Sequence, residues 1–156
     1  IEEDIRVYGK VYKQPRLTAF FASNHKAYGY SNISMSPQPF SPIVNAMRLK
    51  IEKKTKMTFS SCLLNLYRNG QDSNGWHSDD EKELGKNPVI ASVSLGAERI
   101  FHLKHRKIKK LKHKLTLQNG SLLLMSGETQ HHWHHQIPKT KKMIDKRINL
   151  TFRLIK

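Results

Sequence analysis

The feature that most constrains the fold is a succession of short strand-type segments that follows a single helix. From residue 59 onward, apolar or alternating runs are separated by turn signals, among them Asn69-Gly70, Asn74-Gly75 and Asn119-Gly120. The expected strands are residues 59–68, 88–95, 99–105, 114–117, 121–125, 131–137 and 147–155. Many short strands without intervening helices favour an antiparallel sandwich or barrel over a parallel α/β sheet.

The one long helix is expected over about residues 42–56. Pro42 suits the first helical position, and Ile43, Met47 and Ile51 recur at helical spacing. The chain before this helix contains only short extended segments and a loop, so the fold is expected to be mainly β with one supporting helix.

Positive charge is the strongest compositional signal. The 156 residues contain 28 Lys and Arg against 12 Asp and Glu, a net charge of +16. Such an excess attracts polyanions, and nucleic acid is therefore the favoured partner, with a basic surface that serves solubility as the alternative. The densest run is residues 104–114, in which seven of the positions are Lys or Arg. We interpret it as a clamp that follows phosphates, and a merely solvated hairpin is the alternative.

The chain has one cysteine, Cys62, so no internal disulfide is possible. This fits a reducing compartment, the cytoplasm or nucleus, or the nucleoid of a bacterium, and apolar neighbours favour a core role for the thiol. No apolar run approaches the roughly 18 residues of a membrane helix, and no signal-peptide pattern opens the chain. The first residue is not Met, so preceding residues are expected. We also predict a monomer without membrane contact.

His77 and Asp79 form the first candidate for chemistry. They are two residues apart, so on an extended segment both side chains leave the same face and can converge on one metal ion. A second histidine would complete two imidazoles and one carboxylate, the facial set of non-haem Fe(II) oxygenases. Most isolated triplets of this kind are solvated loop residues, so the spacing needs support from the rest of the chain.

The histidine-rich tract at residues 131–135 could supply the second imidazole. In an extended chain His131, Trp133 and His135 share one face, and His132 and His134 share the other. Spacing alone does not choose the ligand, and a solvated or adventitious metal-binding tract is an open alternative.

The segment 147–153 alternates strictly between two kinds of side chain. The polar positions are Arg147, Asn149, Thr151 and Arg153, and the apolar positions are Ile148, Leu150 and Phe152. Arginines on the inner face of a barrel would need an anion, because a buried guanidinium must be paired. A small dicarboxylate bound bidentately meets that need, and a solvent-facing polar side is the alternative.

Four motifs, at residues 65–67, 76–81, 133–138 and 147–153, occur in the order and near the spacing of the AlkB family. The chain thus resembles these Fe(II)- and 2-oxoglutarate-dependent dioxygenases, and it looks closest to the animal homologues that repair alkylated DNA. The resemblance implies a double-stranded β-helix, a cupin-like jelly roll, within a single domain spanning 1–156. A nucleotide-recognition segment would occupy about 1–40 and the jelly-roll core about 58–156.

The resemblance also implies roles for individual residues. The iron ligands and catalytic centre would be His77, Asp79 and His135. The positions that bind 2-oxoglutarate would be Asn65, Tyr67, Arg147, Asn149 and Arg153. The substrate contacts would be Tyr8, Gly9, Lys10, Tyr28, Tyr30, Trp76, Asp80 and Glu81, in which the acidic pair meets the lesion base or steadies an arginine. Tyr8 departs from the aliphatic or Phe finger of duplex-active relatives, so it could wedge into duplex, stack on single strands or be an ordinary strand aromatic.

The implied reaction is oxidative dealkylation of bases such as 1-methyladenine and 3-methylcytosine in single- or double-stranded DNA. It would use Fe(II), 2-oxoglutarate and O2 and release formaldehyde, succinate and CO2. Three alternatives stay open: the same chemistry on RNA, a nucleic-acid-binding module without catalysis, and an oxygenase that acts on protein.

Overall fold

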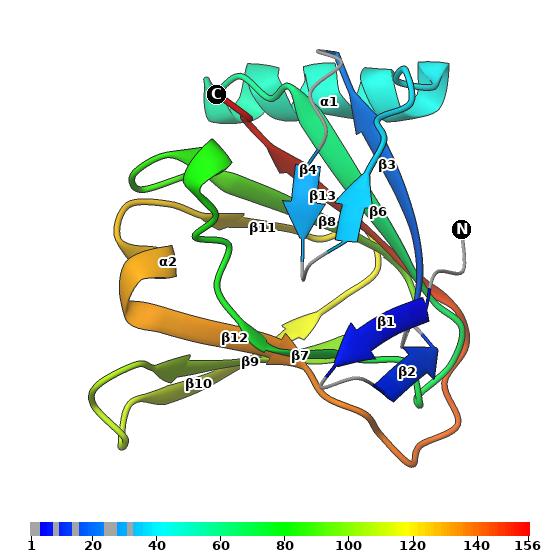
Figure 1. The fold of residues 1–156 in the computed structure, drawn as a ribbon, viewed down its shortest axis with the longest axis vertical. Helices are drawn as coiled ribbons and strands as arrows, with labels where there is room; N and C mark the ends of the chain where they lie inside the picture. The colour runs from blue at the N-terminus through cyan, green and yellow to red at the C-terminus, as the bar shows by residue number, and fades with distance from the viewer. Residues whose placement is uncertain (1–3, 8–9, 14–15, 24–27, 31–32) are drawn as a thin grey trace.

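Two antiparallel sheets face each other and enclose the centre of the molecule (Figure 1). The computed structural model describes residues 4–7, 10–13, 16–23, 28–30 and 33–156, with side chains for 16–23 and 36–156. The larger sheet has the order β11 (Leu122–Met125), β8 (Ile90–Gly96), β13 (Arg147–Arg153), β6 (Ser61–Tyr67) and β3 (Leu17–Ala22). The smaller sheet has the order β10 (Lys112–Leu117), β9 (Arg99–His105), β12 (Trp133–Ile137) and β7 (Asn74–His77). This arrangement confirms the predicted mainly β, jelly-roll fold.

The core between the sheets is apolar away from the site. Its buried members include Phe20, Leu63, Ile90, Phe101 and Ile137, which come from both sheets. Burial of these side chains supplies the main driving force that holds the sheets together.

The helix α1 (Pro42–Thr55) covers the outer face of the larger sheet. It begins with Pro42 in the first turn, and the backbone N–H of Val44 donates to Oγ of Ser41 over 3.4 Å. Sequence spacing placed Ile43 on the apolar stripe, and this is wrong, because Ile43 is 73% exposed. Val44 and Ile51 are the buried helix residues, so the face that packs on the sheet begins at residue 44, one position later than predicted.

Strand β13 lies at the centre of the larger sheet, between β6 and β8. Its alternation places Leu150 and Phe152 under α1, in a cluster with Cys62, and directs the polar positions toward the facing sheet. The predicted two-faced character of this strand is therefore confirmed, and the solvent-facing alternative is excluded.

A second local prediction is also wrong. The histidine tract is not extended throughout, because Thr129–His132 form a short helix, α2, and β12 begins only at Trp133. His131 therefore does not share a strand face with His135.

The N-terminal part forms two short hairpins, β1 (Asp4–Val7) with β2 (Lys10–Lys13), and β4 (Tyr28–Tyr30) with β5 (Ile33–Met35). Tyr8 and Gly9 lie outside the described residues, as do the side chains of Lys10, Tyr28 and Tyr30. The predicted roles of these residues stay predictions. Within the described residues, neither helix of the fold has the length and apolar character needed to cross a membrane.

Candidate metal and co-substrate site

The pairing of β12 with β7 brings two predicted ligands together. His135 lies directly opposite His77, and their ring centroids are 4.2 Å apart. Asp79 follows two residues after His77, and one ligand atom from each of the three residues lies within 4.8 Å of the others. Strand register, which sequence spacing could not reveal, thus selects His135 from the histidine tract.

The tautomer of His77 is set by its neighbours. Nδ1 donates to the backbone oxygen of Gly75 over 2.7 Å, which leaves the lone pair on Nε2. The side-chain amide of Asn74 donates to that Nε2 over 3.3 Å. Burial lowers the pKa of His77. The ring is therefore a neutral ligand with Nε2 directed at the site, the usual form for metal binding.

Asp79 is held as a carboxylate by its surroundings. Burial opposes its ionisation, yet the charge of Arg153, whose Nη2 donates to Oδ1 over 2.9 Å, helps to hold the pKa of Asp79 below its usual value. The backbone N–H of Asp79 donates to Oε1 of the buried Gln130 over 2.9 Å, which fixes the loop after β7.

His135 is buried against the apolar core. Its ring stacks on Phe101 with centroids 5.1 Å apart, and Nε2 lies 4.0 Å from Oδ2 of Asp79. Burial, together with the neighbouring His77, lowers the pKa of His135 to about 3. It too is a neutral imidazole at physiological pH, ready to donate a lone pair.

The other end of the cavity is formed by β6 and β13. Arg147 pairs directly with Tyr67, and its guanidinium lies 5.1 Å from the centre of the tyrosine ring. Arg147 is 1% exposed, and Nη2 donates to Oγ of Ser94 over 2.9 Å. Nε and Nη1 of Arg147 are buried without a hydrogen-bond partner among the described residues. A buried cation with unused donors is costly, so this end is suited to a carboxylate.

Two predicted co-substrate residues are already engaged within the protein. Asn149 donates to Oγ of Ser92 over 2.8 Å and to the backbone oxygen of Val93 over 3.0 Å. Oδ1 of Asn65 accepts a 2.7 Å hydrogen bond from Nε of Arg16. Both asparagines line the cavity, where they organise its walls.

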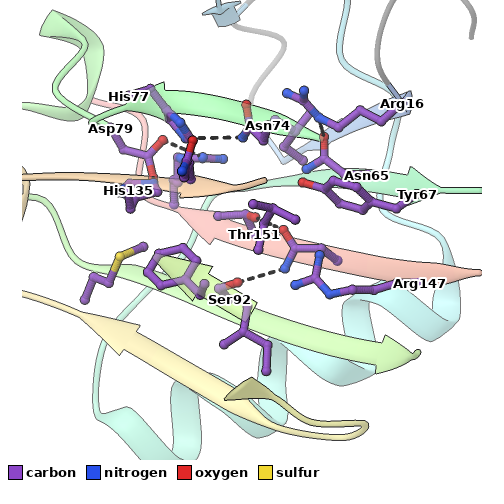
Figure 2. A pocket seen from close by; sticks show the side chains of 18 residues that line it. Arg16, Asn65, Tyr67, Asn74, His77, Asp79, Ser92, His135, Arg147 and Thr151 are labelled. Carbon is purple, nitrogen blue, oxygen red and sulfur yellow. Dashed lines mark hydrogen bonds and ion pairs between the residues drawn. The ribbon is translucent and has the colours of Figure 1, made fainter. Parts of the chain in front are cut away.

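Figure 2 shows that one cavity joins the two ends. Its lining includes all eight predicted metal and co-substrate residues, namely Asn65, Tyr67, His77, Asp79, His135, Arg147, Asn149 and Arg153. Among the predicted substrate residues whose side chains are described, Trp76, Asp80 and Glu81 do not line it. Trp76 follows the strand alternation to the opposite face of β7, and Asp80 accepts a 3.2 Å hydrogen bond from Arg106.

Sequence reasoning missed Arg16, Asn74, Ser92 and Gln130. Arg16 is 6% exposed and reaches the cavity from the start of β3. A single arginine before an apolar run carries no sign that it will be buried, so its role depends on the pairing of β3 with β6. Asn74 lay in an Asn-Gly pair that was assigned only to a turn, although its proximity to His77 in the sequence was visible.

Comparison with known proteins agrees with this geometry. Residues 3–153 match the 2OG-Fe(II) oxygenase superfamily, and the chain belongs to this family. The donor set fits the metal in that name, because two neutral imidazoles and a carboxylate converge, and Arg147 with its unused donors fits a carboxylate of 2-oxoglutarate. The prediction of Fe(II), 2-oxoglutarate and O2 as cofactors is confirmed at the level of the family.

The similar proteins are AlkB homologues. The human alpha-ketoglutarate-dependent dioxygenase alkB homolog 3 is 42% identical over 166 residues, covering 99% of this chain and 55% of the relative. The human DNA oxidative demethylase ALKBH2 is 38% identical over 160 residues, covering 97% of this chain and 60% of the relative. The chain thus spans little more than half the length of these relatives. A solved structure of OsALKBH1 has the same fold, with a TM-score of 0.65 at 18% identity over 87% of this chain and 77% of that one.

Proposed function

We propose that the protein removes alkyl groups from N-alkylated nucleobases in DNA by oxidation, using Fe(II), 2-oxoglutarate and O2. The observation that carries the proposal is one cavity with two chemically distinct ends. The ligand set His77, Asp79 and His135 lies at one end, and the buried cation of Arg147 lies at the other. This arrangement suits a co-substrate that binds the metal and presents a second carboxylate to an arginine.

The residues of the cavity would have three roles: to hold the metal, to orient the co-substrate and to exclude water. His77, Asp79 and His135 would hold Fe(II), which together with 2-oxoglutarate and O2 supplies the oxidation of the N-alkyl carbon. Arg147 would neutralise a carboxylate of the co-substrate, while Asn65, Tyr67, Asn149 and Arg153 would fix the surrounding walls. The apolar side chains Phe101, Leu117, Met125 and Ile137 line the same cavity and would keep it dry.

The nucleic-acid substrate is supported by charge and by the relatives. The net charge of +16 favours a polyanion, and the human relative ALKBH2 is named a DNA oxidative demethylase. Tyr8, Gly9, Lys10, Tyr28, Tyr30, Asp80 and Glu81 remain our predicted substrate contacts. Because a base inside a duplex is unreachable, we expect it to be extruded and held by such contacts. Trp76, which was predicted with them, contacts Lys104 and His102 outside the cavity. An intracellular monomer, cytoplasmic or nuclear, completes the proposal.

The test is release of formaldehyde and succinate from methylated oligonucleotides. Single-stranded DNA, duplex DNA and RNA of one sequence, each with a single 1-methyladenine, are compared in parallel with their unmethylated counterparts. We expect product from methylated DNA, and absence of formaldehyde on all three methylated substrates would refute the proposal. A preference for RNA would assign the same chemistry to the other polymer. Asp79→Ala should abolish product formation, and circular dichroism should show that this variant still folds.

A further inference from the structure

The smaller sheet has a second face that the proposed chemistry does not use. Strand alternation directs His77, His135, Phe101 and Leu103 toward the facing sheet. The residues between them therefore point outward. We call these residues the outer-sheet face: Trp76 from β7, His134 from β12, His102 and Lys104 from β9, and Lys112 and Lys114 from β10.

Trp76 is the aromatic centre of this face. It is 40% exposed, and it lies outside the cavity between the sheets. Nζ of Lys104 lies 4.2 Å from its ring centre, and the ring of His102 lies 6.4 Å away in a tilted arrangement. An exposed aromatic ring beside a cation is the combination that binds unpaired bases and their phosphates.

The register of the strands continues this cationic character across the sheet. Lys104 lies between His134 on one neighbouring strand and Lys112 on the other, and His102 lies opposite Lys114. Like charges directly opposite each other in a sheet are destabilising, so the Lys104–Lys112 pair has an energetic cost in the free protein. The nearby acid, Asp80, is paired with Arg106 over 3.2 Å. A bound polyanion would relieve the repulsion.

The side chains of this row already influence one another. Burial lowers the pKa of His102, and the charge of Lys114 lowers it further. The lysines on β9 and β10 therefore make this part of the face positively charged.

We propose that the outer-sheet face binds a single-stranded polynucleotide at a second site, separated from the metal cavity by the thickness of the smaller sheet. A base stacks on the exposed surface of Trp76, and Lys104, Lys112 and Lys114 neutralise the adjoining phosphates. A single strand is favoured over a duplex because stacking on Trp76 requires an unpaired base. This inference rests on the proposed function only in taking a nucleic acid as the partner.

The chain provides an intrinsic probe for the test. It has two tryptophans, Trp76 and Trp133, so Trp133→Phe leaves Trp76 as the only one. Phenylalanine preserves an aromatic ring beside His105, whose ring centroid lies 5.2 Å from that of Trp133. Fluorescence of this variant is titrated with an unmodified oligothymidylate of about 20 nucleotides at low salt. We expect quenching that saturates, whereas a signal that does not change on binding would overturn the proposal.

Charge removal supplies the second measurement. The triple variant K104Q/K112Q/K114Q is compared with K50Q/K53Q/K54Q, which removes the same charge from the exposed side of α1 on the other sheet. We expect about tenfold weaker binding for the outer-sheet variant and a decrease of about 2 in the slope of log K against log salt, since each phosphate contact on a single strand contributes about 0.7. Equal losses in the two variants would show only a general effect of charge and would overturn the proposal.

The two proposals fail separately. Binding is measured on metal-free protein with an unmodified strand, so it does not depend on turnover. If methylated DNA yields no formaldehyde while the oligothymidylate still quenches the fluorescence of Trp76, the proposed function is refuted and the second site is supported. If formaldehyde is produced while the fluorescence of Trp76 does not change, the second site is refuted and the proposed function is supported.

Discussion

Arg153 donates a 2.9 Å hydrogen bond to Asp79, and both side chains are buried. The pair joins β13, the central strand of the larger sheet, to the loop after β7 that carries a predicted metal ligand. Arg153→Leu should therefore leave a buried carboxylate without its cation, which typically costs about 3–5 kcal/mol of folding free energy. Urea unfolding of the metal-free protein at pH 7 measures this loss.

The double variant R153L/D79L is the control for that prediction. Replacing both members of a buried ion pair with apolar residues is often neutral, so the second substitution should restore much of the lost stability. If the double variant is as unstable as the sum of the single ones, Arg153 acts through packing and the electrostatic explanation is wrong.

Asn74 should affect metal affinity. Its amide donates to Nε2 of His77 over 3.3 Å, and this nitrogen carries the lone pair that a metal requires. Binding must break this hydrogen bond, whose net value is about 1 kcal/mol. Asn74→Leu should therefore tighten binding of Co(II), used as a spectroscopic substitute, by about three- to tenfold. Titration by visible absorption measures the change, and equal or weaker binding would contradict it.

Much of this site could be predicted because strand alternation is a local property. The period of two in residues 147–153 placed Arg147 and Arg153 on one face, and the structure directs that face toward the facing sheet. The choice of His135 from the four histidines of its tract depends on its register opposite His77. Register across strands is a tertiary property, which is why the motif resemblance, and not the spacing, had to supply it.

The errors have the same physical origin. The exposed side of α1 depends on how the helix docks, so Ile43 could not be placed from periodicity alone. Alternation, a local property, already places the side chains of Trp76 and His77 on opposite faces of β7, but the contact of Trp76 with Lys104 depends on how the strands of the smaller sheet pair. Arg16 enters the cavity only because β3 pairs with β6.

Gly96 should tolerate substitution less well than Gly120. Both have positive φ, 85° at Gly96 and 75° at Gly120, so a side chain at either costs about 1–2 kcal/mol in backbone strain. A Cβ at Gly96 would also lie 2.4 Å from the backbone oxygen of Lys146, whereas at Gly120 nothing lies within 4 Å. Gly96→Ala should therefore destabilise the fold by about 3 kcal/mol or more, against about 1–2 for Gly120→Ala.

Because Gly96 pairs with Arg147 across β8 and β13, the same clash should weaken 2-oxoglutarate binding. Thermal unfolding and a co-substrate titration of the two alanine variants test both expectations together. Similar stabilities for the two variants would mean that the chain relaxes at Lys146 without cost.

Asp72 should make stability depend on pH at the turn between β6 and β7. Arg68 donates to it from its backbone N–H, from Nε over 2.8 Å and from Nη2 over 3.0 Å. Burial opposes ionisation of Asp72, but these hydrogen bonds outweigh it and lower the pKa of the carboxyl. In the unfolded chain the carboxyl of Asp72 has a pKa of about 3.9, so the unfolded state binds protons more readily than the folded state. The stabilisation is therefore fully present above that pH and is lost as the pH falls through the lower pKa of the folded state.

The Asp72→Asn variant should be about 1 kcal/mol less stable at pH 7, a modest loss because Arg68 is 40% exposed and screened by solvent. Urea unfolding should show that this difference in stability between the two proteins shrinks toward pH 3. Asp145→Asn in the exposed 139–146 loop is the control. A difference that is constant with pH would mean that the loss comes from the changed side-chain shape and not from the charge.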